Sequence, residues 1–184
     1  LGNANALDDN LVALPHPDGA SAMLAKKDVV AHFTTPPYLF QELGHPGYHL
    51  VLDGSEAFGD DFNFNVTVVA ENYHDKNPRG YAAFVQGLSD TMAWINDNKR
   101  EAAEILAPEF SLDPDTIYRY ITADGVNYTT APYGLMGFSE FMREAGYISK
   151  VPEGLSDIAW ENVTALVGKG EGRPSKLEEA QWAK

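Results

Sequence analysis

The spacing of the apolar residues changes at about residue 70, and this change constrains the fold more than any other feature of the sequence. After residue 70, apolar residues recur every three or four positions, as on one face of a helix. Before it, β-branched and apolar residues gather in short runs with the length of single β-strands. These runs are "NLVALP" (10–15), "DVVAHFT" (28–34), "YHLVL" (48–52) and "FNVTVVA" (64–70).

Short helical segments alternate with the first of these runs. "GASAMLAKK" (19–27) separates the first run from the second, and "PYLFQEL" (37–43) separates the second from the third. Strands that alternate with helices are typical of a mainly parallel sheet, because parallel strands need a crossover connection. The first part of the chain therefore predicts an α/β fold.

Helix start signals mark the second part of the chain. Asn77 before Pro78 predicts an N-cap and a first-turn proline, followed by a long amphipathic helix. Asn98 with Glu101 three positions later resembles a capping box. Further helices are predicted from Asp113-Pro114 through "DTIYRYI" and over "GLMGFSEFMREAGYI" (134–148), and a polar peripheral arm is predicted from about residue 168.

The composition is that of a globular protein with a strong negative charge. The 184 residues are 44% hydrophobic, and 27 acidic against 13 basic residues give a net charge of -14. Such a charge repels phosphate backbones and anionic lipid headgroups, which argues against nucleic acid and membrane surfaces as partners. No apolar stretch reaches the roughly 20 residues that cross a bilayer.

Motifs for catalysis and for metal binding are missing from the sequence. It has no cysteine, which excludes disulfides, thiolate catalysis and cysteine-based zinc sites. It has no nucleophile elbow, P-loop or dinucleotide fingerprint. His45 and His49 have the spacing of a helical metal pair, but Pro46 and Gly47 between them oppose a helix. We therefore expect no catalytic residue, no metal and no cofactor.

The helices of the second part lack a sheet of their own in the sequence. Only one predicted strand, 64–70, lies after residue 60, and a lone strand cannot form a sheet. Helices with apolar faces need a second layer to cover them. The pattern predicts that this chain is the later part of a longer protein with two lobes.

Two stretches of the sequence resemble a known family. They are "LVALPHPDGASAMLAKKDVVAHFTTPPYLFQEL" (11–43) and "FNVTVVAENYHDKNPRGYAAFVQGLSDTMAWINDNKREAAEI" (64–105). In the order of their parts they resemble the periplasmic solute-binding proteins of the nitrate, sulfonate and taurine type, which serve ABC importers. The resemblance extends over about residues 8–165. It implies a type II periplasmic-binding-protein fold, with two α/β lobes and a ligand between them, of which this chain is the C-terminal half to two-thirds.

The resemblance also implies a division of the chain. Residues 1–56 would be the remainder of the second lobe, 57–66 the hinge crossover, 67–167 the helical return part of the first lobe and 168–184 a polar C-terminal tail. The first lobe's opening strands are absent from the sequence. We therefore expect the chain to associate with another copy of itself or with the missing N-terminal part, because apolar helix faces stay exposed.

The candidate ligand site begins where the second apolar run ends. Thr34 and Thr35 lie at the carboxyl end of the predicted strand 28–34, where open α/β sheets place their ligands. Thr35 would cap the following helix, with Pro36 in the first helical position and Tyr38 in the first turn. The alternative is that these residues only end a strand.

Aromatic and amide side chains alternate near the predicted crossover. Phe62 and Phe64 would share one face of an extended chain, whereas Asn63 and Asn65 would share the other. One of these pairs would therefore face the ligand cleft between the two lobes. His16, at the end of the first apolar run, is a further candidate. The structural alternatives are that the aromatic residues are core and that His16 lies in a loop.

The predicted function is ligand capture for an ABC transporter. The protein would bind a small organic anion or an aromatic or heterocyclic metabolite, close around it by a hinge motion and deliver it to the permease, without covalent chemistry. The threonines favour an anion, and the aromatic residues favour a ring. The predicted location is the periplasm, or the extracellular side of the membrane as a lipoprotein.

Two alternative functions share the fold that the resemblance implies. A pyrimidine synthase of thiamine biosynthesis uses a cysteine-rich segment, which this sequence lacks. An effector-sensing domain of a transcription regulator would require a DNA-binding helix-turn-helix upstream.

Overall fold

The computed structural model describes residues 3, 5–58 and 62–167 of the 184-residue chain. The chain divides by its packing into two compact units, Leu1–Val51 and Leu52–Lys184. The predicted polar tail, 168–184, and part of the predicted hinge crossover, 59–61, lie outside the described residues.

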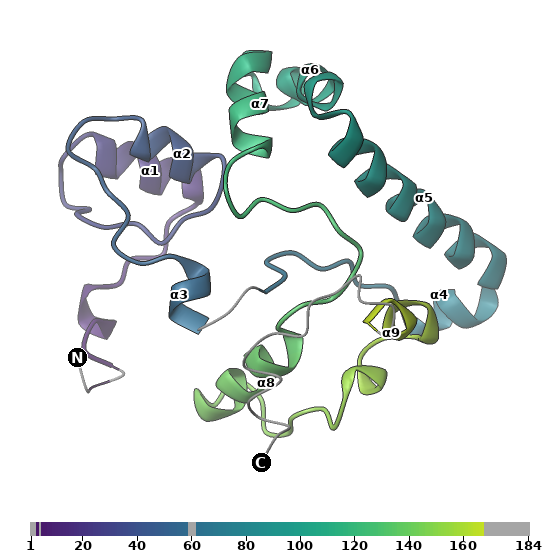
Figure 1. The fold of residues 1–184 in the computed structure, drawn as a ribbon. Helices are drawn as coiled ribbons and strands as arrows, with labels where there is room; N and C mark the ends of the chain where they lie inside the picture. Colours follow the sequence, from purple (N-terminus) through teal and green to yellow (C-terminus); the bar gives the residue numbers. More distant parts are fainter. Residues whose placement is uncertain (1–2, 4, 59–61, 168–184) are drawn as a thin grey trace. The chain divides into compact units, whose positions relative to one another are not determined.

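Helices, turns and irregular chain make up the described residues, and none of these residues lies in a β-strand (Figure 1). The prediction of an α/β fold is therefore wrong, and so is the two-lobed periplasmic-binding-protein fold that the resemblance implies. The four apolar runs predicted to be strands are instead irregular or extended chain without a pairing partner among the described residues.

The missing sheet has a physical reason in the surroundings of these runs. β-branched residues favour strands because they pack well on a pleated surface that is half buried by a neighbouring layer. No described strand lies beside these runs, and Val30 is 91% exposed, Val51 83% and Val68 86%. The composition of such a run indicates extended backbone, but it does not supply the partner that makes a strand.

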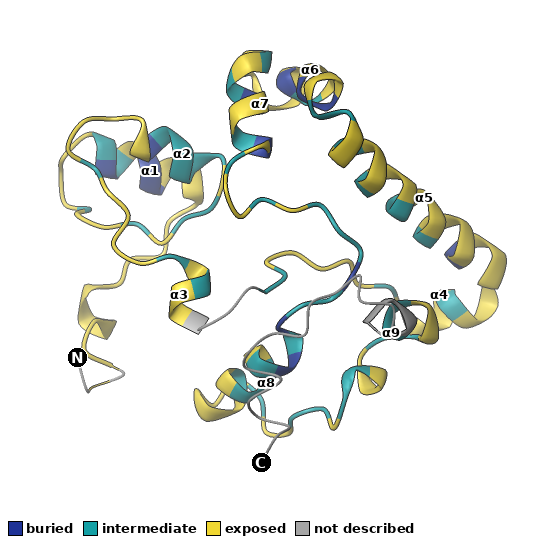
Figure 2. Cartoon of the chain, in the orientation of Figure 1, coloured by how far each residue is buried: buried dark blue, intermediate teal, exposed yellow. Residues whose placement is uncertain are grey.

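The first unit is built on two short helices, α1 (His16–Leu24) and α2 (Tyr38–Leu43), which pack against each other after a 3-10 turn, η1 (Asp8–Asn10). Both helices were expected from the sequence. The Tyr48 hydroxyl donates to the Met23 carbonyl at 2.9 Å and ties the chain after α2 back to α1. The buried residues of this unit are Gly19, Ala20, Met23 and Glu42 (Figure 2).

The second unit holds the longer helices, as the apolar spacing predicts. Its elements are α3 (Gly54–Phe58), α4 (Glu71–Lys76), α5 (Pro78–Asp97), α6 (Lys99–Phe110), α7 (Pro114–Ile121), α8 (Leu135–Glu144), η2 (Leu155–Asp157) and α9 (Glu161–Val167).

The main core of the second unit lies between α6 and α7. Small alanines on α6 allow the two helices to approach, and isoleucines of α7 fill the space between them. The buried members are Ala102, Ala103, Ala107, Ile117 and Ile121 (Figure 2). Both helices expose their other faces, which is the expected result of a 3.6-residue apolar period.

The helix start signals are partly confirmed. Pro78 begins α5 after Asn77, and Asp113 caps α7 by accepting from the Thr116 amide at 2.8 Å. The capping box predicted at Asn98 is wrong, because the Asn98 side chain donates to the Trp94 carbonyl at 2.9 Å. Asn98 is the single residue between α5 and α6, and its side chain bonds to the end of α5 instead of capping α6.

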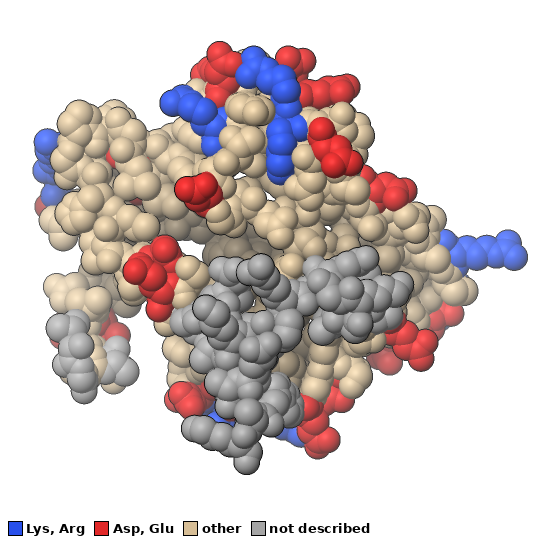
Figure 3. Space-filling model, viewed as in Figure 1, with Lys and Arg blue, Asp and Glu red and all other residues tan. Residues whose placement is uncertain are grey.

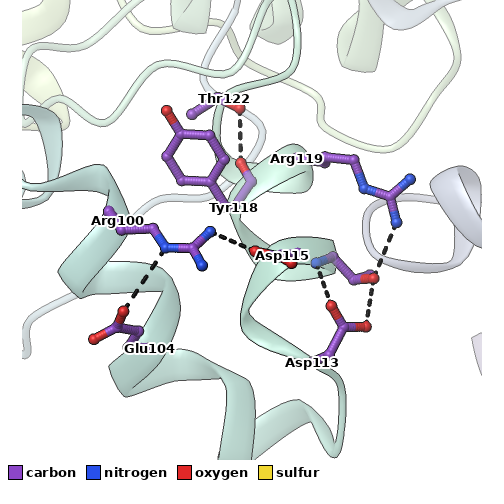
Figure 4. A network of polar contacts seen from close by, with 8 residues as sticks. Arg100, Glu104, Asp113, Asp115, Tyr118, Arg119 and Thr122 are labelled. Carbon is purple, nitrogen blue, oxygen red and sulfur yellow. Dashed lines mark hydrogen bonds and ion pairs between the residues drawn. The ribbon is translucent and has the colours of Figure 1, made fainter.

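Polar side chains cover the exposed side of the α6–α7 pair (Figure 4). Arg100 bridges the two helices through an ion pair with Asp115, 2.6 Å between Nη1 and Oδ1, and its Nε lies 3.7 Å from Glu104. Arg119 donates to the Thr116 hydroxyl at 3.0 Å. These groups are exposed, so the network stabilises the pair only weakly and its role is structural.

Aromatic side chains join the α4–α5 junction to the chain before α9. The His74 and Trp160 rings stack with centroids 4.2 Å apart and planes 3° apart. The buried Tyr81 ring lies edge-on to both, and its hydroxyl donates to Asn162 at 2.8 Å. This group holds together parts of the second unit that lie about half the chain apart.

Candidate functional site

His16, Thr34 and Tyr38 meet in the first unit, although they come from three separate elements. His16 is the first residue of α1, Thr34 lies in the chain before α2, and Tyr38 is the first residue of α2. The Thr34 hydroxyl lies 3.4 Å from Nδ1 of His16. The His16 and Tyr38 rings are stacked, with centroids 6.0 Å apart and planes 19° apart. These three residues are termed the His16 cluster below.

Prolines set the start of both helices that carry the cluster. Pro15 is the N-cap of α1 and Pro17 lies in its first turn, whereas Pro36 and Pro37 precede α2. Proline fixes φ near the helical value and has no N–H, so it is well tolerated at a helix start and poorly inside a helix. Each cluster ring therefore occupies the first helical position beside a proline.

A buried pair of side chains lies behind the His16 cluster. The Nδ1 atom of His32 lies 2.7 Å from a carboxylate oxygen of Glu42, and the two side chains are 11% and 4% exposed. The His32 ring also lies against α1, because a Cβ added to Gly19 would be 2.5 Å from its Nε2 atom. The ring centroids of His16 and His32 are 5.6 Å apart.

The His16 cluster combines hydrogen-bonding groups with flat ring surfaces. His16 is exposed, and Thr34 and Tyr38 are half-buried. An imidazole N–H and hydroxyl groups can donate hydrogen bonds to an anion. Stacked rings also provide apolar area. The arrangement can hold a small ligand that has an acidic group and a planar or apolar part.

Thr35 and Pro36 lie next to the cluster but do not have the predicted roles. The N-cap of α2 is Pro37, and the Thr35 hydroxyl donates to the Pro36 carbonyl at 3.4 Å. The predicted Thr35 cap is therefore wrong, because the helix begins two residues later than expected. The Pro36-Pro37 peptide bond is cis. With only six residues in α2, its amide end does not provide an anion site.

Phe62 and Asn63 are held by contacts within the second unit. The Phe62 ring stacks on Phe138, with centroids 6.4 Å apart, and it lies close to Gly54, whose added Cβ would meet the ring at 3.0 Å. The Asn63 amide donates to the Tyr133 carbonyl at 3.1 Å, and the Tyr133 amide donates back to the Asn63 side chain. Phe62 thus packs on α8, and Asn63 fastens the start of this segment to the chain before α8.

Phe64 and Asn65 are exposed, unlike the two residues before them. The expectation that Phe62 shares its surroundings with Phe64, and Asn63 with Asn65, rests on the two-residue period of a strand. This segment is not a strand, so the period does not apply. Of the predicted site residues, His16, Thr34 and Tyr38 come together, and the four at 62–65 lie in the other unit.

The sequence interpretation missed Glu42 and Gly19. The His32 side chain itself is packed, with 11% of it exposed. The signal for Glu42 is a carboxylate in a mostly apolar helix, ten positions after a histidine in an apolar run. Neither residue type is often buried alone, so together they indicate a pair.

Metal ligands do not gather in the part of the chain that the structure describes. No group of three or more histidine, cysteine, aspartate or glutamate side chains is arranged to hold an ion there. His45 and His49 are both exposed, and the chain between them is not helical.

The ammonium group of Lys99 lies in unusual surroundings in the second unit. Its ammonium lies 4.4 Å from the centroid of the Tyr128 ring and donates to Asn96 at 3.0 Å. Burial lowers the pKa of Lys99 and raises the pKa of Tyr128. Asn96 also donates to the Tyr128 carbonyl at 2.7 Å. These contacts fasten the chain after α7 to the junction of α5 and α6, so they explain packing rather than binding.

Charges at the surface are mixed around α6 and α7. Figure 3 shows acidic and basic groups interspersed over these helices, in agreement with the ion pairs of Arg100. An anion would meet carboxylates as well as cations there, so this region does not form a basic patch.

The chain was compared with protein-family models, curated proteins and solved structures. None of them matches it. The resemblance to solute-binding proteins therefore depends only on the two stretches quoted above. None of the described helices has the length and apolar character needed to span a bilayer.

Proposed function

We propose that the protein binds a small organic solute at the His16 cluster and acts as the solute-binding component of an ABC importer. The observation that carries the binding site is the convergence of His16, Thr34 and Tyr38 from three elements. The link to an importer rests on the resemblance of residues 11–43 and 64–105. A ligand position between two α/β lobes is not part of this proposal, because the described residues form no strand.

The cluster suggests how the ligand is held. An acidic group, such as a sulfonate or a carboxylate, accepts hydrogen bonds from His16 and the Thr34 hydroxyl. A planar or apolar part of the ligand lies along the Tyr38 ring. Ligand capture requires no covalent step, and the bound solute passes to the membrane permease in the periplasm or at the outer face of a membrane that anchors the protein.

A thermal-shift screen of the full chain tests this function. The probes are methanesulfonate, taurine, nitrate, benzoate and a neutral pyrimidine. A ligand that binds only the folded protein stabilises it by about 2.7 kcal/mol at one hundred times its Kd, which raises the Tm of the unit that binds it. His16→Ala should abolish the shift, whereas His45→Ala, at an exposed histidine of the same unit, should keep it.

The screen separates the parts of the proposal. A shift with the acidic probes that His16→Ala removes supports the site. A shift with the neutral pyrimidine alone contradicts the acidic ligand but keeps Tyr38 as the contact. No shift with any probe, or a shift that survives in His16→Ala, contradicts binding at the His16 cluster.

A further inference from the structure

Glu42 is the one buried carboxylate, at 3% exposure, among the residues that the structure describes. It lies on α2, in a unit whose other buried residues are small or apolar. A buried carboxylate is unfavourable unless it is paired and hydrogen-bonded. Its position therefore depends on the partner that it meets.

His32 is that partner, and it is held from two sides. Glu42 lies at its Nδ1 atom, at 2.7 Å, and Gly19 of α1 lies at its Nε2 edge. With both edges occupied, the ring can neither flip nor tilt freely. The pair thus joins α2 to α1 through one ring.

The fixed ring of His32 is a neighbour of His16. The two ring centroids are 5.6 Å apart, with planes tilted by 51°. On its other sides His16 contacts the Thr34 hydroxyl, at 3.4 Å, and the stacked Tyr38 ring. Since His16 is otherwise exposed, His32 is the buried surface that limits where its ring can lie.

We propose that Glu42 is a positioning residue for the His16 cluster, which acts by fixing the His32 ring against which His16 is placed. The alternative is that the pair only stabilises the fold. Well-packed apolar residues stabilise as well as a buried ion pair or better, so stability alone is a weak reason for this pair. A hydrogen bond at Nδ1 also fixes which edge of the His32 ring faces Glu42, which apolar packing alone does not specify.

The inference rests on the proposed function for its ligand, but the position of the His16 ring can be measured without one. We would use the full chain with Glu42→Gln, which keeps the shape and removes the charge. Asp18→Asn is the matched control, since it removes a charge two residues from His16 on the same helix. His32→Asn is a second variant, which keeps a donor for Glu42 but removes the ring.

Two measurements are made well below the Tm of each variant. The imidazole NMR signals of His16 report the surroundings of its ring. The Kd for benzoate reports the ligand site. Loss of one hydrogen bond to a charged group corresponds to about a tenfold change in Kd. We expect Glu42→Gln and His32→Asn to move the His16 signals and to raise the Kd about tenfold, and Asp18→Asn to do neither.

The outcomes distinguish the two proposals. If benzoate does not bind the parent protein, the acidic aromatic ligand fails, and the NMR signals alone decide whether Glu42 positions His16. If Glu42→Gln lowers the Tm but leaves both the His16 signals and the Kd unchanged, the pair is only structural and the inference is overturned. If Glu42→Gln does not fold, unchanged His16 signals in His32→Asn overturn it equally.

Discussion

At Gly19, the neighbouring His32 ring leaves no room for a side chain. A Cβ at this position would lie 2.5 Å from Nε2 of His32, far inside van der Waals contact. The His32 ring cannot simply move away, because Glu42 holds its other edge. Gly19 is therefore a condition for the buried pair, although its place in the helical stretch "GASAMLAKK" gives no sign of this.

Gly19→Ala should lower the free energy of unfolding of the first unit by about 1–3 kcal/mol, the usual range for overpacking. The control is Gly87→Ala on α5, where an added Cβ meets no atom within 4 Å. This change should raise stability by about 0.5–1 kcal/mol, because alanine favours a helix over glycine. Amide hydrogen exchange in α1 and α5 measures both effects. Equal protection of α1 in Gly19→Ala and the parent would contradict the close approach.

Asp113 shows how a single cap responds to pH. Hydrogen bonds from the Thr116 hydroxyl and amide hold the pKa of Asp113 below its ordinary value. The folded state therefore favours the ionised carboxylate. Its stabilisation is complete above the ordinary pKa of aspartate and is lost as the pH falls through the lowered pKa in the folded protein.

Asp113→Ala should accordingly lower the Tm at pH 7, and the difference from the parent should shrink at acidic pH. Asp124→Ala, at an exposed aspartate in the loop after α7, serves as the control and should change the Tm little. Thermal unfolding at several pH values, followed by circular dichroism, measures the difference. A destabilisation that stays constant down to strongly acidic pH would count against the carboxylate cap.

At the scale of elements, the longer helices could be predicted from the sequence, the short helices α3, α4 and α9 were not predicted, and the predicted strands are wrong. A helix such as α5 forms its hydrogen bonds within one segment, so Pro78 and the apolar spacing after it are enough to indicate it. A strand needs a second segment. The run at 64–70 contains residues that favour strands, but nothing within it states which chain lies alongside. In the candidate site, His16, Thr34 and Tyr38 could be singled out from their places at the ends of apolar runs, whereas the His32–Glu42 pair depends on how the chain before α2 folds back on that helix and could not be read from a local pattern.

The α6–α7 pair should be the most sensitive element of the second unit. Ile117→Ala removes a buried side chain and leaves a cavity, so we expect a loss of about 2–4 kcal/mol in the free energy of unfolding. Ile105→Ala on α6 is the control, because Ile105 is exposed and its loss should change stability by no more than about 0.5 kcal/mol. Urea unfolding followed by tryptophan fluorescence reports this unit. Equal losses in the two variants would contradict the assigned core.

At the scale of the whole molecule, the described residues of both units leave large apolar side chains uncovered. Phe33 and Val30 are exposed in the first unit, and Phe64 and Val68 in the second. Patches of this kind promote association, whereas a net charge of -14 opposes it. We therefore expect the chain to associate more strongly as salt screens the charge.

Sedimentation at low and at high sodium chloride concentration measures this balance. The average mass should rise with protein concentration, and more steeply at high salt. Val68→Lys should weaken the association because it places a charge on the apolar surface, whereas Ala82→Lys, on an exposed position of α5, serves as a control for charge alone. A monomer under all these conditions would contradict self-association through the exposed apolar residues.

The pairing of Asn63 with Tyr133 joins positions seventy residues apart. Closing so long a loop costs chain entropy before the contact that offsets this cost can form. The neighbouring helices α6 and α7, in contrast, are joined by a short turn. The order of folding should follow from this difference. The α6–α7 pair forms early, and the hydrogen bonds between Asn63 and Tyr133 form late. Contacts that form this late affect the rate of unfolding more than the rate of folding.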